Sequence, residues 1–230
     1  YKQGINWSVN KMSPAKEIIV INPNSNEHVT SSMNTALEPL RLTNGPIIRS
    51  VTNVNGPSGI ESQQDADTAA LQVVDIIKRN NSADAFVIAC FSDPGIFAAR
   101  EVTNKPVFGI AESGILTALS LGSSFGILAI LDTSVPRHIR YIRSLGLEKR
   151  LAGDLAIGLG VAELSDEKKT FHRLQEVGRK LRDNSGASVL ILGCAGMARY
   201  RLGLQESLGM AVVDPSQAAV SMAVSAVLLN

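Results

Sequence analysis

The sequence is poor in aromatic residues, in long hydrophobic runs and in any excess of charge. Only 4% of its 230 residues are aromatic, whereas 45% are apolar, and this aliphatic bias suits a parallel sheet covered by helices. The 22 Lys and Arg nearly balance the 21 Asp and Glu, and no basic stripe contains interleaved aromatic residues. A nucleic-acid partner is therefore not expected. Nor is a membrane partner expected, because the apolar stretches fall well short of the roughly 20 residues that span a bilayer.

The N-terminal segment lacks the basic and apolar regions of a secretion signal, so a cytoplasmic protein is expected. Residues 1–16 contain the only Trp and show no periodicity. We interpret them as an N-terminal extension, poorly ordered or of vector origin, with Met12 as a candidate natural start.

Cysteine and histidine are also scarce. The two cysteines are Cys90 and Cys194, and none of the three histidines shows ligand spacing with either of them. No metal site is therefore expected. A disulfide between the two cysteines is disfavoured in a cytosolic chain.

Strand-like and helix-like segments alternate along the chain, which is typical of an α/β fold built on parallel sheets. The expected strands are 17–22, 47–53, 85–90, 106–110, 125–131, 155–161, 188–193 and 211–214. The expected helices are 25–42, 61–80, one from about 94, one from 113, 134–145, 165–184, 197–208 and 216–228.

An internal repeat divides this alternation into two similar halves. The segment NNSADAFVIACFSDPGIF around Cys90 is similar to DNSGASVLILGCAGMARY around Cys194, 104 residues later, and the same offset aligns PVFGIA with MAVVDP. We therefore predict two α/β lobes related by a pseudo-twofold axis, each with a four-stranded parallel sheet and with the active site in the cleft between them. The expected division assigns 17–112 and 211–230 to the first lobe and 113–210 to the second.

Both cysteines end a predicted strand just before a predicted helix, where parallel sheets bind ligands. The helix N-terminus is expected to lower the thiol pKa towards neutrality. Two thiols facing one cleft suit racemisation, because a thiolate removes a proton from one face of a carbon and a thiol returns one to the other. Backbone N–H groups after each cysteine would stabilise the enolate-like intermediate. The alternative is that both cysteines are merely small buried residues.

Four motifs together resemble the hydantoin/allantoin racemase family of the aspartate/glutamate racemase superfamily. They are INPNS at 21–25, ACFSDPG at 89–95, GIAE at 109–112 and LGCAGM at 192–197, and the resemblance covers roughly residues 17–228. It implies two lobes with Cys90 and Cys194 as the catalytic pair. It also implies a homo-oligomer of purine catabolism that uses no pyridoxal phosphate, nucleotide or metal.

The residues after the cysteines bear on the substrate. Amino-acid racemases of the superfamily typically follow the first cysteine with Asn-Thr, where this chain has Phe91-Ser92, and glutamate racemases carry Thr-His where it has the second motif. These departures favour a neutral cyclic ureide, allantoin first, as the small-molecule substrate. Two alternatives stay open: an amino-acid racemase or related isomerase or decarboxylase, and a catalytically silent protein that binds a small molecule.

Further site residues are assigned by position alone. Asn24 and Ser25 either bind the ureide ring or cap the helix that follows them. Asp93 is expected to cap the helix begun by Pro94, and the segment NGPSG at 55–59, which lacks the Lys of a phosphate-binding loop, is interpreted as a turn or mobile flap. Gly193 and Gly196 are expected to let the backbone approach the ligand closely. The predicted substrate-binding residues are Asn24, Ser25, Ser92, Glu112, Thr133, Ala195 and Gly196.

Overall fold

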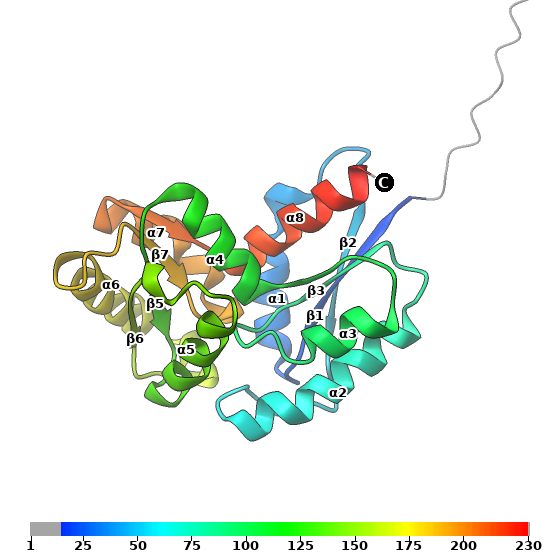
Figure 1. The fold of residues 1–230 in the computed structure, drawn as a ribbon, viewed down its shortest axis with the longest axis horizontal. Coiled ribbons are helices and arrows are strands. Elements are labelled where there is room, and N and C mark those ends of the chain that lie inside the picture. Colours follow the sequence, from blue (N-terminus) through cyan, green and yellow to red (C-terminus); the bar gives the residue numbers. More distant parts are fainter. Residues whose placement is uncertain (1–14, 230) are drawn as a thin grey trace, which may run out of the picture.

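The computed structural model describes residues 15–229 and has two α/β lobes side by side (Figure 1). The N-terminal extension expected at 1–16 lies almost wholly outside the described residues. The strands are β1 (Glu17–Asn22), β2 (Ile47–Thr52), β3 (Ala85–Ile88), β4 (Val107–Gly109), β5 (Phe125–Ala129), β6 (Leu151–Ala156), β7 (Val189–Leu192) and β8 (Ala211–Val213). The α-helices are α1 (Glu27–Ala36), α2 (Gln63–Arg79), α3 (Ile96–Val102), α4 (Ile110–Leu121), α5 (Val135–Ser144), α6 (Glu167–Asp183), α7 (Arg201–Leu208) and α8 (Pro215–Leu229).

The two sheets have the same topology. The first runs β2-β1-β3-β4 and the second β6-β5-β7-β8, and every neighbouring pair is parallel. The repeat offset of 104 residues separates the first residues of β2 and β6, of β3 and β7, and of β4 and β8. The predicted α/β fold with two four-stranded parallel sheets is therefore confirmed.

The chain crosses between the lobes twice. Helix α4 follows the last strand of the first sheet and packs against β4 as well as against β7 of the second sheet. After β8 the chain returns, and α8 packs against β1, β3 and β4. Because Leu190 in β7 pairs with Val212 in β8, the second lobe extends through β8, beyond the expected boundary at residue 210.

Two elements differ most from the sequence expectation. Strand β6 spans Leu151–Ala156 rather than 155–161, because its residues LAGDLA form a half-buried edge strand without an aliphatic run. The helix expected over 25–42 ends at Ala36, and a short 3-10 helix follows at Glu38–Leu40, where Pro39 cannot supply a helical N–H.

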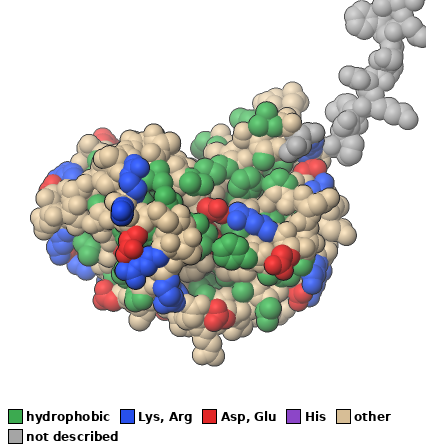
Figure 2. All heavy atoms as spheres, in the orientation of Figure 1, with side chains coloured by type: hydrophobic (Ala, Val, Ile, Leu, Met, Phe, Trp, Pro, Cys, Tyr) green, Lys and Arg blue, Asp and Glu red, His purple; other side chains and the backbone are tan. Residues whose placement is uncertain are grey.

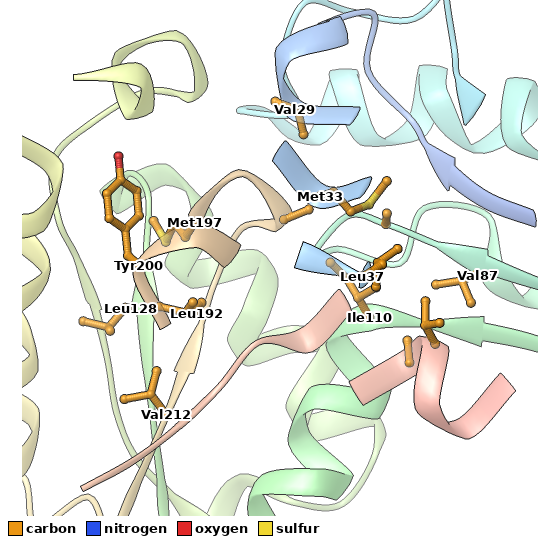
Figure 3. Close-up of a cluster of buried hydrophobic side chains, with 14 of the residues drawn as sticks. Val29, Met33, Leu37, Val87, Ile110, Leu128, Leu192, Met197, Tyr200 and Val212 are labelled. Carbon is orange, nitrogen blue, oxygen red and sulfur yellow. The ribbon is translucent and has the colours of Figure 1, made fainter. Parts of the chain in front are cut away.

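The largest buried cluster of apolar side chains spans both lobes (Figure 3). Met33 and Ile110 of the first lobe and Leu128 and Met197 of the second belong to it, and none of the four has more than a trace of exposed surface. A smaller cluster lies within the first lobe, and another joins Phe125 and Ile142 of the second lobe to Phe91 and Ala218 of the first. The lobes therefore share one core, which fixes how the carboxyl ends of the two sheets face each other.

The surface carries both signs of charge in a scattered arrangement, as Figure 2 shows for one face. Within residues 15–229, no helix combines the length and apolarity required to cross a bilayer.

Candidate active site

A cavity lies between the lobes, at the carboxyl ends of both sheets, with about 400 Å³ of empty space including its open mouth. The part of this space that a water-sized sphere can enter is about 30 Å³, so the cavity is narrow. The loops after β1, β3, β5 and β7 contribute to it, and both cysteines line it as free thiols. The lining residues are Asn24, Val29, Ile60, Ala89, Cys90, Phe91, Ser92, Ile130, Ser134, Arg137, His138, Val161, Gly193, Cys194 and Ala195.

The two cysteines occupy equivalent turns. The backbone N–H three residues after Cys90 donates to the Cys90 carbonyl at 2.9 Å, and the N–H three residues after Cys194 donates likewise at 3.1 Å. The N–H two residues after each cysteine, that of Ser92 or of Gly196, is hydrogen-bonded to the sulfur. The sequence repeat is thus also a repeat of the thiol environment.

The thiols are far from neutral pKa values, contrary to the sequence expectation. Burial raises the pKa of Cys90 to about 12 and that of Cys194 to about 11, and the N–H donors at each sulfur offset this only in part. Cys194 directly precedes a 3-10 helix (Ala195–Tyr200), but a turn separates Cys90 from α3. A thiolate at Cys194 also raises the pKa of Cys90, so ionisation of one thiol keeps the other protonated.

Asn24 lies in the cavity wall directly after β1. Its Oδ1 accepts hydrogen bonds from Asn22 Nδ2 at 3.0 Å and from the Asn26 N–H at 2.9 Å. Within residues 15–229 no acceptor takes the Asn24 Nδ2 protons. This amide group is therefore available to donate to a carbonyl oxygen in the cavity.

Ser25 does not line the cavity. Its N–H and Oγ both donate to the Pro57 carbonyl, at 2.9 and 3.3 Å, and so join the loop after β1 to the loop after β2. The capping role belongs to Asn26, whose Oδ1 accepts from the His28 N–H at 3.0 Å.

Ser92 and Ala195 line the cavity, but Gly196 does not. A Cβ at Gly196 would lie 3.2 Å from Leu164 Cδ1. A Cβ at Gly193 would lie 2.6 Å from the Leu128 carbonyl oxygen. This glycine therefore permits close approach to the backbone of β5, whereas the sequence predicted close approach to a ligand.

Glu112 lies outside the cavity, where its Oε2 pairs with Arg100 Nη2 at 2.7 Å. Its backbone N–H and that of Ala111 donate to the Asp93 carboxylate, each at 2.9 Å. Asp93 therefore caps α4, not the helix after Pro94 as expected. Burial raises the pKa of Asp93 to about 7, although the two N–H donors lower it.

Thr133 is exposed and outside the cavity, and its Oγ1 donates to the Glu61 carbonyl at 3.2 Å. Glu61 Oε1 accepts from the Val161 N–H at 2.8 Å. The loop after β2, interpreted from the sequence as a turn or mobile flap, is thus tied to the second lobe at its end. Ile60 from this loop lines the cavity.

Arg137, His138 and Asp154 of the second lobe were not predicted as site residues. Arg137 and His138 of α5 are buried in the cavity wall. His138 Nδ1 is hydrogen-bonded to Asp154 Oδ2 at 2.8 Å, and its ring meets Phe91 edge-on with centroids 5.1 Å apart. Within residues 15–229, no group of three or more His, Cys, Asp or Glu is arranged to hold a metal ion.

The sequence profile of the Asp/Glu/Hydantoin racemase family matches residues 18–223. A hydantoin racemase of Paenarthrobacter aurescens is 36% identical over 218 residues, covering 93% of this chain and 92% of that protein. An allantoin racemase from Klebsiella pneumoniae has a similar structure, with a TM-score of 0.85 and 32% identity over 94% of this chain and 89% of that one. The allantoin racemase of Pseudomonas fluorescens gives a TM-score of 0.87 and 28% identity over 93% and 91% of the respective chains.

Proposed function

The chain belongs to the Asp/Glu/Hydantoin racemase family and is a racemase, and we propose that it inverts C5 of a cyclic ureide, allantoin or another 5-substituted hydantoin, by proton transfer between Cys90 and Cys194. The observation that carries this proposal is the pair of free thiols lining one cavity, each from an equivalent turn of its own lobe. A ring between them would present opposite faces of C5 to the two sulfurs.

The electrostatics of the pair support a division into base and acid. Because a thiolate at Cys194 raises the pKa of Cys90, the second thiol stays protonated when the first is ionised. The thiolate takes the C5 proton, and the electron pair moves into the adjacent carbonyl to give an enolate. The opposite thiol then donates its proton to C5 from the other face, so the thiolate and thiol exchange positions and no cofactor takes part.

The ring carbonyls require hydrogen-bond donors as negative charge develops on them. Asn24 Nδ2 is one donor that the cavity offers for this purpose. The N–H groups of Ser92 and Gly196 instead face the sulfurs, so in this proposal they stabilise a thiolate.

The test is loss of optical rotation by one allantoin enantiomer in deuterated water, with C5–H exchange followed by proton NMR against an enzyme-free control. We expect enzyme-dependent racemisation with deuterium at C5. Cys90→Ser and Cys194→Ser are each expected to slow stereoinversion by about 100- to 10,000-fold. Retained inversion in both variants would overturn the two-thiol mechanism.

The same assay separates the alternatives. If allantoin is inert, 5-alkyl hydantoins are tested next, followed by aspartate and glutamate. Exchange of an amino acid alone would make the chain an amino-acid racemase, and binding without exchange of any compound would favour a silent binding protein. The expectations of a cytoplasmic homo-oligomer in purine catabolism, with neither nucleic-acid nor membrane partners, stay predictions.

A further inference from the structure

Arg137 is the charged residue of the cavity wall, and it is only 9% exposed. Its Nη1 donates to the carbonyls of Glu61 and Thr133, at 3.2 and 2.9 Å, and its Nη2 donates to Ser134 Oγ at 3.3 Å. A guanidinium has five N–H donors. The Nε–H, which is buried and has no partner among residues 15–229, and one Nη2–H are therefore left over.

The three acceptors that Arg137 does have are neutral. Among residues 15–229 no carboxylate forms an ion pair with it, and no Asp or Glu lines the cavity. An ionised Cys90 raises the pKa of Arg137 more than Asp65 does, and the Asp65 carboxylate accepts hydrogen bonds from Ser62. A buried cation with no carboxylate partner and with donors left over is costly, so this wall of the cavity is complementary to an acceptor oxygen.

The position of Arg137 points to a particular part of a ligand. Arg137 and Ser92 line the cavity and also a neighbouring groove between α2, α3 and α5. Neither cysteine lines that groove. Arg137 therefore borders both spaces. In the proposed mechanism the ring lies between the sulfurs, and a substituent that extends towards the groove reaches Arg137.

We infer that Arg137 determines substrate specificity by binding an acceptor oxygen on the C5 substituent, either a carboxylate or a ureido carbonyl. The inference rests on the proposed function and narrows it to hydantoins whose substituent carries such an oxygen. Hydantoins with purely alkyl substituents leave the Nε–H unpaired and are poorer substrates.

The experiment uses a matched pair of substrates, hydantoin-5-acetate and its apolar isostere 5-isobutylhydantoin, with allantoin as a third. Arg137→Met removes the N–H donors of the guanidinium while keeping most of the aliphatic stem. Arg143→Met on the same helix is the control, because Arg143 is exposed and pairs with Glu148. Racemisation is measured as kcat/KM for each enzyme with each substrate.

We expect Arg137→Met to lower kcat/KM for hydantoin-5-acetate and allantoin about 10- to 100-fold more than for 5-isobutylhydantoin, as for loss of a charged hydrogen bond. Arg143→Met should leave these ratios unchanged. Arg137→Lys keeps the positive charge without the planar set of guanidinium donors and should give an intermediate ratio. It replaces Arg137→Met in the experiment if the Met variant does not fold. An equal loss on all three substrates would show that Arg137 acts on the Cys90 thiolate or on the fold, and would overturn the inference.

A binding measurement separates failure of this inference from failure of the proposed function. Calorimetric titration with hydantoin-5-acetate requires no turnover. A Kd that is weaker by at least tenfold in Arg137→Met supports the subsite even if wild-type enzyme exchanges no C5–H. Equal Kd values, or no binding to wild-type enzyme, refute it.

Discussion

The two thiols combine a shared environment with strongly raised pKa values. Removing them from water disfavours the thiolate more than one backbone N–H at each sulfur favours it. Such a thiolate is scarce at neutral pH but is a stronger base towards a C–H bond. Since folding raises both pKa values, deprotonation above about pH 9 favours the unfolded chain, and stability falls as pH rises towards 11 and 12.

Alkylation by iodoacetamide reports these pKa values for each cysteine. The rate at both Cys90 and Cys194 is expected to rise about tenfold per pH unit between pH 7 and 10, without a plateau, because only the thiolate reacts. The measurement is mass spectrometry of each cysteine peptide. Urea-unfolded protein, in which both rates should level off near pH 9, is the control. A plateau below pH 9 in the folded protein contradicts the raised values.

Single residues differed in how well the sequence predicted them. Cys90 ends a predicted strand, and Cys194 and Asn24 follow one within two residues; this placement was sufficient to bring them to one cavity. Thr133 and Glu112 were assigned by the same rule but point elsewhere. Arg137 and His138 were missed because VPRHIRYIRS resembles a surface helix. Their burial depends on tertiary contacts, of Arg137 with Glu61 and of His138 with Asp154 and Phe91.

At the scale of elements, the interlobe packing depends on contact between α4 and α8. A Cβ at Gly114 would lie 2.9 Å from Pro215 Cβ and 3.3 Å from Ile191 Cγ2. Helix α4 can therefore approach the start of α8 only because residue 114 has no side chain. Helix α7 contrasts with this, since a Cβ at Gly203 would make only ordinary contacts with the Phe171 ring, at 3.4 and 3.5 Å.

The same substitution is therefore expected to have opposite effects at two helical sites. Gly114→Ala should destabilise the protein by about 1 to 3 kcal/mol through overpacking. Gly203→Ala should stabilise it by about 0.5 to 1 kcal/mol through helix propensity. Urea unfolding followed by circular dichroism measures both. Stabilisation by Gly114→Ala would mean that the helices separate without cost.

Most elements were predictable because buried parallel strands have aliphatic sequences and because the repeat shows the same pattern of strands and helices in both halves of the chain. The exceptions are elements whose position depends on tertiary contacts. Edge strand β6 has a sequence with no strand signature, and the capping of α4 by Asp93 joins residues from separate loops. Local periodicity contains no information about either.

At the scale of the whole molecule, the shared core makes the two lobes one folding unit. Met33 is fully buried in the cluster that also contains Leu128 and Met197 of the second lobe. The sequence predicted two lobes but could not show this continuity, because pairing across the pseudo-twofold axis is set by shape rather than by pattern.

Met33→Ala is expected to cost about 2 to 5 kcal/mol, as for other large-to-small core changes. Hydrogen exchange followed by mass spectrometry should show equal loss of protection in peptides covering β1 and β5, with a single unfolding transition. Leu71→Ala, at a residue that is 75% exposed, is the control and should change stability by less than about 0.5 kcal/mol. Loss of protection confined to the first sheet would mean that the lobes unfold separately.

The return of α8 to the first sheet has a consequence for synthesis on the ribosome. The first sheet is complete at Gly109, but the helix that covers β1, β3 and β4 begins only at Pro215. The nascent first lobe therefore emerges with an apolar face exposed, and it keeps that face exposed until the whole second lobe has been translated. Domains usually fold in the order in which they are made. Here the half made first is the half finished last, and its uncovered strands are the surface that a chaperone would bind.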